Sequence, residues 1–254
     1  MENPNDADGV RSSPLGLILC LVVFLILAAG GFVFFLGSRI ATTVTTLAPA
    51  VPTNVPPRII RTIELTNFYN CALTNAINMG RLKVHPNNLG EFPAGEGEYG
   101  GMLFAVRGMI QLGGAYPKQR HGITIGGRAH GLHILHGTAG LTDDGTEIAR
   151  LVLHYADGAE QPLAINYGDH VRDWWKWKKT EDPNVGADSE LAWTGSNRFA
   201  AAKNVEIRVY CSTFANPFPD KLIESIDYIR TAGTSCTPFM LGLTVEEADP
   251  VPAK

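Results

Sequence analysis

NVEIRVYCS, at residues 204–212, is the stretch that decides the fold. Its odd-numbered positions, from Val205 to Cys211, are apolar, while its even-numbered positions, from Asn204 to Tyr210, are polar or amphipathic. Successive side chains of a β-strand point to opposite faces, so this period of two predicts a strand with one face on a core. A helix would repeat its apolar positions every three or four residues instead.

The same period recurs on both sides of this stretch, with turn sequences such as Asp157–Gly158 and Asn216–Pro217 between the repeats. Many short strands separated by turns predict an all-β protein, and we expect an antiparallel β-sandwich, with a barrel as the alternative. Short helices are expected only at 71–79 and 168–176. The other expected strands are 59–65, 101–111, 121–126, 130–136, 148–156, 160–167, 222–229 and 238–246.

An uncharged apolar run, LGLILCLVVFLILAAGGFVFFL, occupies residues 15–36. As a helix it would extend about 33 Å, enough to cross the hydrocarbon core of a bilayer. A cleaved signal peptide is the alternative, but its apolar region is shorter, at about 7–15 residues, and follows a basic segment. Residues 1–14 are acidic and contain one cation, Arg11. We therefore expect a retained transmembrane α-helix, with the lipid bilayer as its partner.

The remaining chain divides by composition. Residues 37–57 form a linker rich in Thr and Pro, which favours extended conformations over a packed core. Residues 58–247 are long enough to bury a core and are expected to form the β-sandwich domain, and 248–254 form a C-terminal tail. Because such a stalk usually faces outward, residues 1–14 are assigned to the cytoplasm. The protein is predicted to be single-pass in the cell membrane, with its C-terminal domain extracytoplasmic.

The composition excludes several classes of protein. Lys and Arg number 21 against 25 Asp and Glu, so the chain lacks the cationic surplus of a nucleic-acid-binding protein. Its 4 cysteines are too few for a disulfide-rich scaffold, and Cys71, Cys211 and Cys236 allow at most one disulfide in the domain. No G-x-S-x-G, H-E-x-x-H or Walker sequence occurs. A non-catalytic protein is therefore expected, with a hydrolase as a minor alternative.

Several motifs together resemble a known type of domain: LTNFYNCALT (65–74), FPAGEGEYGGMLFAVRGMIQL (92–112), YPKQRHGITIGGRAHGLHILHGT (116–138), VLHYADG (152–158), INYGDHVRDWW (165–175), AWTGSN (192–197), STFANPFPDKLIESIDY (212–228) and PFMLGLTVE (238–246). They are similar to the jelly-roll, galactose-binding-like modules of bacterial surface and membrane-anchored proteins. Some of those modules are carbohydrate-binding modules appended to glycoside hydrolases. The resemblance implies a jelly roll preceded by the membrane helix, and carbohydrate as the ligand class. The segment 175–190 is particular to this chain.

Three of the four tryptophans cluster in one short segment, INYGDHVRDWWKW at 165–177. Exposed Trp rings stack on the C–H faces of sugars, and interleaved lysines at 176, 178 and 179 suit an anionic ligand. Alternatively Trp174 and Trp175 close one end of the core, and Arg172 and its flanking carboxylates form an ion-pair network. The candidate ligand-binding residues are Tyr167, Asp169, Arg172, Asp173, Trp174, Trp175 and Trp177.

The histidines and turn aspartates give weaker signals for metals. On a strand, His130 and His136 share one face and His133 points to the other, so HGLHILH alone does not supply three zinc ligands. A site combining His136 with His154 is an alternative to interior or rim histidines. The turn aspartates predict turns first, although related sandwiches often carry a structural calcium. No catalytic metal or cofactor is predicted.

These observations predict a membrane-anchored binding module for carbohydrate. The alternative, from another class, is a protein-interaction or sensor domain that contacts an envelope protein. Neither hypothesis includes nucleic acid as a partner.

Overall fold

The computed structural model describes residues 58–77, 87–179 and 181–248, all within the compact unit Pro56–Lys254. Across those ranges no helix has both the length and the apolar character needed to traverse a bilayer. The expected tail 1–14, membrane helix 15–36 and linker 37–57 lie outside the described residues, as does most of 248–254.

Nearly all the regular secondary structure in the described part of the chain is β-strand, paired in antiparallel ladders, as the alternating sequence predicts. Within the described ranges, one short helix, α2, interrupts the strands. In chain order the elements are β1 (Ile60–Thr62), β2 (Gly95–Tyr99), β3 (Met102–Val106), β4 (Ile110–Gln111), β5 (Gln119–Gly127), β6 (Ala129–Ala139), β7 (Glu147–Tyr155), β8 (Glu160–Asn166), β9 (Trp175–Trp177), β10 (Ser189–Gly195), α2 (Arg198–Ala202), β11 (Val205–Ala215), β12 (Ile223–Arg230) and β13 (Thr237–Glu247).

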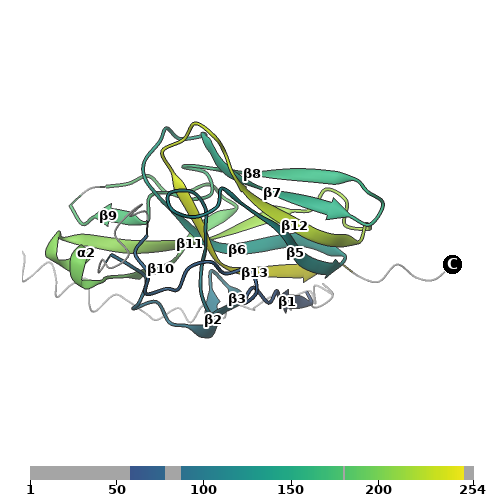
Figure 1. Ribbon diagram of the computed structural model, residues 1–254, viewed down its shortest axis with the longest axis horizontal. Coiled ribbons are helices and arrows are strands. Elements are labelled where there is room, and N and C mark those ends of the chain that lie inside the picture. The colour runs from purple at the N-terminus through teal and green to yellow at the C-terminus, as the bar shows by residue number, and fades with distance from the viewer. Residues whose placement is uncertain (1–57, 78–86, 180, 249–254) are drawn as a thin grey trace, which may run out of the picture. The chain divides into compact units, whose positions relative to one another are not determined.

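Two main sheets stack in layers (Figure 1). The seven-stranded sheet has the order β1-β13-β6-β11-β10, with β4 paired to β13 and β9 paired to β11. The four-stranded sheet has the order β5-β12-β7-β8. The β2–β3 hairpin forms a separate two-stranded sheet.

The first hydrophobic core lies between the two main sheets. Leu132 and Ile134 of β6 face Leu151 of β7 and Ile226 of β12, and all four are fully buried. Each strand contributes alternate residues, which is the arrangement of a β-sandwich. Burial of this apolar surface is the main force that holds the two sheets together.

A second core covers the opposite face of the seven-stranded sheet. Leu135 and Phe239, on adjacent strands β6 and β13, pack with Phe104 of the β2–β3 hairpin and with Leu89 and Trp174. The central strands β6, β11 and β13 are therefore buried on both faces. This explains why their sequences are apolar at consecutive positions, whereas a strand with one wet face alternates more cleanly.

The structure differs from the sequence-based expectations in several local features. The predicted helix at 168–176 is wrong: this segment is irregular until β9 begins at Trp175, and Gly168 has a left-handed φ of 86°. The described part of the predicted helix at 71–79 also lacks helical structure. The predicted strand 101–111 is divided into β3 and β4 at Arg107–Met109. Strands β2, β9 and β10 and helix α2 were not expected.

The predicted facing of the histidines along β6 is confirmed. His136 is buried and shares a 2.7 Å hydrogen bond with the hydroxyl of Ser212, and burial lowers its pKa to about 3. His133 contacts Thr213 Oγ1 at 2.9 Å, on the opposite face of β6. The alternative of a joint His136–His154 site is wrong, because β6 and β7 belong to different sheets and His154 pairs with Asp227. Cys71, Cys211 and Cys236 are buried free thiols.

Candidate functional site: an aromatic pocket beside β9

The predicted ligand-binding segment crosses from one main sheet to the other. It leaves the four-stranded sheet at the end of β8 and joins the seven-stranded sheet at β9, which pairs with β11. Two isolated bridges fix its path, between Tyr167 and Val171 and between Thr138 and Asp173. In addition, the Trp174 amide donates to the Thr138 carbonyl at 2.7 Å. The segment is thus held rigidly against the end of β6.

The first half of this segment makes structural contacts. The Tyr167 ring is buried, and its hydroxyl accepts a hydrogen bond from the Asp173 amide at 3.3 Å. Arg172 is buried and makes a two-pronged ion pair with Asp144. Asp169 is exposed and receives a 3.4 Å hydrogen bond from Asn166. Tyr167, Asp169 and Arg172 do not line the pocket described next.

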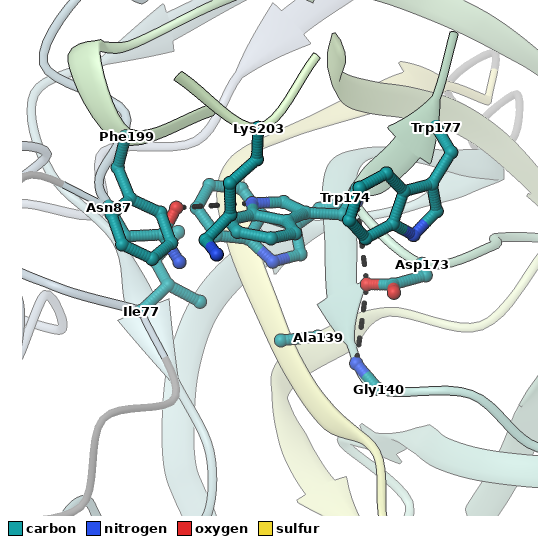
Figure 2. Close-up of a pocket in the computed structure, with 10 residues that line it drawn as sticks. Ile77, Asn87, Ala139, Gly140, Asp173, Trp174, Trp177, Phe199 and Lys203 are labelled. Carbon is teal, nitrogen blue, oxygen red and sulfur yellow. Dashed lines mark hydrogen bonds between the residues drawn. The ribbon is translucent and has the colours of Figure 1, made fainter. Parts of the chain in front are cut away.

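The second half of the segment lines a pocket of about 390 Å³ (Figure 2). This volume lies within the range of small-ligand sites, about 300–1,000 Å³. Aromatic side chains form much of its wall, from β9 and from α2. Its lining residues are Ile77, Asn87, Ala139, Gly140, Asp173, Trp174, Trp175, Trp177, Phe199 and Lys203.

The three tryptophans have different environments. Trp174 is 3% exposed and packs edge-on against Phe239, with ring centroids 6.2 Å apart, so it belongs to the second core. Trp175 is partly buried, and its indole N–H donates to the side-chain oxygen of Asn87 at 3.1 Å. Trp177 is 52% exposed at the rim. Trp177 therefore has the indole that is free to meet a ligand, and Trp175 is fixed in place.

Asp173 places a carboxyl group on the pocket wall. Its Oδ1 accepts hydrogen bonds from the Gly140 amide at 3.3 Å and the Trp175 amide at 3.4 Å. Among the described residues no donor lies within hydrogen-bond distance of Oδ2. Burial raises the pKa of this carboxyl to about 6. The Asp173 carbonyl accepts from the Arg208 guanidinium at 2.7 Å, which fixes its backbone. Asp173 can thus accept a ligand hydroxyl at Oδ2 without losing a bond.

Helix α2 supplies the opposite wall. Asn197 caps its first turn, since the Asn197 side chain accepts from the Ala200 amide at 2.7 Å. Phe199 packs against Trp175 with ring centroids 5.5 Å apart. The ammonium of Lys203, just after the helix, lies 5.1 Å from the centre of the Phe199 ring. Figure 2 shows Lys203 and Phe199 extending from α2 toward the indoles. The Asn197 cap fixes the start of the helix and thereby helps to position Phe199 and Lys203.

Sequence reasoning missed Asn87, Phe199 and Lys203. The stretch SNRFAAAK at 196–203 carried a usable signal, because Asn before an Ala-rich run is a typical helix start. Nothing local, however, placed that helix beside the tryptophans. Its position follows from the pairing of β9 with β11, which aligns Trp177 with Val205.

Two other hollows flank β10. One is lined by Arg208, whose guanidinium is buried in a 2.7 Å ion pair with Asp182. The other exposes part of Cys211, and burial raises the pKa of this thiol to about 12. A protonated thiol is a poor nucleophile, so this hollow offers no activated group. Among the described residues no group of three or more His, Cys, Asp or Glu side chains is arranged to hold a metal ion.

No protein-family profile matches the chain, and a search of curated proteins returns no match. Any functional assignment therefore rests on the pocket itself.

Proposed function

We propose that residues 58–247 form a non-catalytic carbohydrate-binding module of the galactose-binding-like, jelly-roll type. We further propose that the helix at 15–36 anchors this module in the cell membrane and displays it outside the cell. The observation that carries the proposal is the half-exposed indole of Trp177, which lies beside a pocket of about 390 Å³.

Sugars require two kinds of contact, and the pocket offers both. The flat face of an indole packs against the C–H groups of a pyranose ring. Hydroxyl groups need partners of fixed orientation, and Asp173 Oδ2 and the Asn87 amide group lie in the wall. Trp175 holds Asn87 in place, and Gly140 and Trp175 hold Asp173. The polar groups are therefore preorganised, which lowers the entropic cost of binding.

Binding is expected to be weak, with Kd between micromolar and millimolar, because the pocket is small and open to solvent at Trp177. The test uses the full-length chain purified in a neutral detergent. A glycan array identifies ligands, and calorimetry then measures the affinity of wild type, Trp177→Ala and Leu191→Ala. Leu191 is the matched control, because it is also about half-exposed but lies on β10, outside the pocket.

The proposal predicts saturable binding to at least one glycan, at least tenfold weaker in Trp177→Ala and unchanged in Leu191→Ala. Circular dichroism should show the same β-rich fold for all three proteins. Two results would contradict the proposal: no saturable binding to any glycan by folded protein, or equal affinity in Trp177→Ala and wild type. Specific crosslinking to an envelope protein in the first case would favour the alternative of an interaction domain.

A further inference from the structure

Some Lys and Arg side chains of the domain have an ion-pair or hydrogen-bond partner, and others have none. In the described ranges most arginines pair with a carboxylate, as Arg172 does with Asp144, or donate to backbone carbonyls, as Arg230 does to Cys236. Among the described residues, six Lys and Arg side chains have neither a carboxylate nor a carbonyl partner. They are Lys118, Lys176, Lys178, Lys179, Arg198 and Lys203.

All of these except Lys118 lie on β9, on the two residues after it, or on α2 and its cap. Strand β9 runs beside the start of β11, and the Lys178 amide donates to the Asn204 carbonyl at 3.2 Å. Residues 178–179 thus lie close to Lys203, the cation of the pocket wall. Lys176 points away from the pocket and lines the hollow beside Arg208.

The carboxylates nearby do not neutralise this group. Asp182 is engaged by Arg208 at 2.7 Å. Asp173 contributes one carboxylate in the pocket wall, which does not balance the three cations Lys178, Lys179 and Lys203. Glu206 lies opposite Lys176 in the β9–β11 ladder, and Glu181 is close in sequence, but neither forms an ion pair among the described residues. The pocket rim therefore carries a net positive charge on a protein that is acidic as a whole.

We propose that the carbohydrate bound at this pocket is anionic, a glycan whose sugars carry carboxylate or sulfate groups. Lys203 contacts the anionic group of the sugar that stacks on Trp177. Lys178 and Lys179 attract neighbouring charged sugars along the chain. Complementary charge of this kind adds specificity and a salt-dependent attraction. This inference rests on the proposed function, because it names the substrate class of the same pocket.

The test compares ligands that differ only in charge. Oligogalacturonate and its fully methyl-esterified, neutral form share one backbone, and a heparin-derived oligosaccharide supplies the sulfate arm. Each is titrated into the full-length chain in neutral detergent at low and at high salt. The variants are Lys203→Gln, which removes the charge but keeps a polar side chain, and Lys118→Gln as the control, because Lys118 is the unpaired cation that lies outside β9, the two residues after it, and α2 with its cap. A single-stranded DNA of equal charge tests for general polyanion binding.

The inference predicts that at least one anionic glycan binds wild type at least tenfold more tightly than the neutral ester at low salt. That preference should shrink several-fold in Lys203→Gln and at high salt, and stay unchanged in Lys118→Gln. Three results would overturn it: equal affinity for ester and acid, an unchanged preference in Lys203→Gln, or DNA binding as tight as glycan binding. If neutral glycans alone bind, this inference fails while the proposed function stands. If no glycan binds, the proposed function fails with it.

Discussion

The guanidinium of Arg172 donates to both carboxylate oxygens of Asp144, at 2.9 and 2.8 Å. The Arg172 side chain is 9% exposed and that of Asp144 is 57% exposed, so the cation is buried while its partner remains in contact with water. This pair connects the turn after β6 to the segment that leads into β9. It therefore helps to hold the wall of the pocket, although neither residue lines it.

Asp144→Ala should destabilise the domain by about 1–2 kcal/mol, because it leaves a buried guanidinium without its anion, with a discount for the exposure of Asp144. Hydrogen bonding from Arg172 lowers the pKa of Asp144. The contribution of this ion pair to stability is thus fully present above the unfolded-state pKa of Asp144. It is lost as the pH falls through the folded-state pKa of Asp144. Urea denaturation at pH 7 and in acid checks this. Asp143→Ala is the control, and equal losses in the two variants would contradict the assigned role.

Truncation of Trp174 should destabilise the domain far more than truncation of Trp177. Trp174→Ala removes a buried ring from the second core and should cost about 3–5 kcal/mol. Trp177→Ala removes a half-exposed ring and should cost less than about 1 kcal/mol. Thermal or chemical denaturation distinguishes the two. A large loss of stability in Trp177→Ala would show that this indole is structural and would weaken its assignment to ligand binding.

The raised pKa of Asp173 predicts a specific dependence of the domain's stability on pH. Burial raises the pKa of its carboxyl to about 6, so the folded state holds this proton while the unfolded chain, with a value near 3.8, releases it. Stability should fall as pH rises from about 4 to about 6 and then level off. Other carboxylates titrate in the same range, so the difference between wild type and Asp173→Asn isolates this effect. Asp173→Asn should match wild type at pH 4 and exceed it by about 2 kcal/mol at pH 7. A constant difference across that range would contradict the prediction.

A substitution at Gly137 tests the packing of the second core. It lies opposite Phe239 in the β6–β13 ladder, and a Cβ at this position would approach Phe239 Cζ to 2.2 Å. Gly137→Ala should therefore destabilise the domain by about 1–3 kcal/mol or more. Adding Phe239→Leu frees the space, so the double variant should lose less than the sum of the two single losses. If the stability losses of the two single variants simply add in the double variant, the Phe239 ring does not cover Gly137.

The sequence predicted the positions of the main strands better than it predicted which faces of the sheets are covered by other segments. Alternation at 204–212 correctly placed Val205, Ile207 and Cys211 on one buried face. The same pattern could not show that Tyr210 and Phe214, on the other face, are buried as well, because that depends on which segments cover the sheet. Short strands such as β2, GEGEY, lack an apolar repeat, and pairing with β3 determines them.

The site was predictable only in part. The tryptophan cluster drew attention to residues 165–177, and four of the seven candidates in that segment line the pocket. Asn87 and Phe199 come from distant parts of the chain, and only the fold brings them to Trp175. Tyr167 and Arg172 share the same local sequence but fix the segment from behind. Sequence proximity could not distinguish contact with a ligand from support of the wall.

The most direct test of the account is a structure of the chain bound to the tightest glycan that the array identifies. The account predicts a sugar ring stacked on the Trp177 indole, with a hydroxyl hydrogen-bonded to Asp173 Oδ2 and an anionic group at the Lys203 ammonium. A glycan seated elsewhere, such as the hollow beside Arg208, with the aromatic pocket free of sugar, would contradict it.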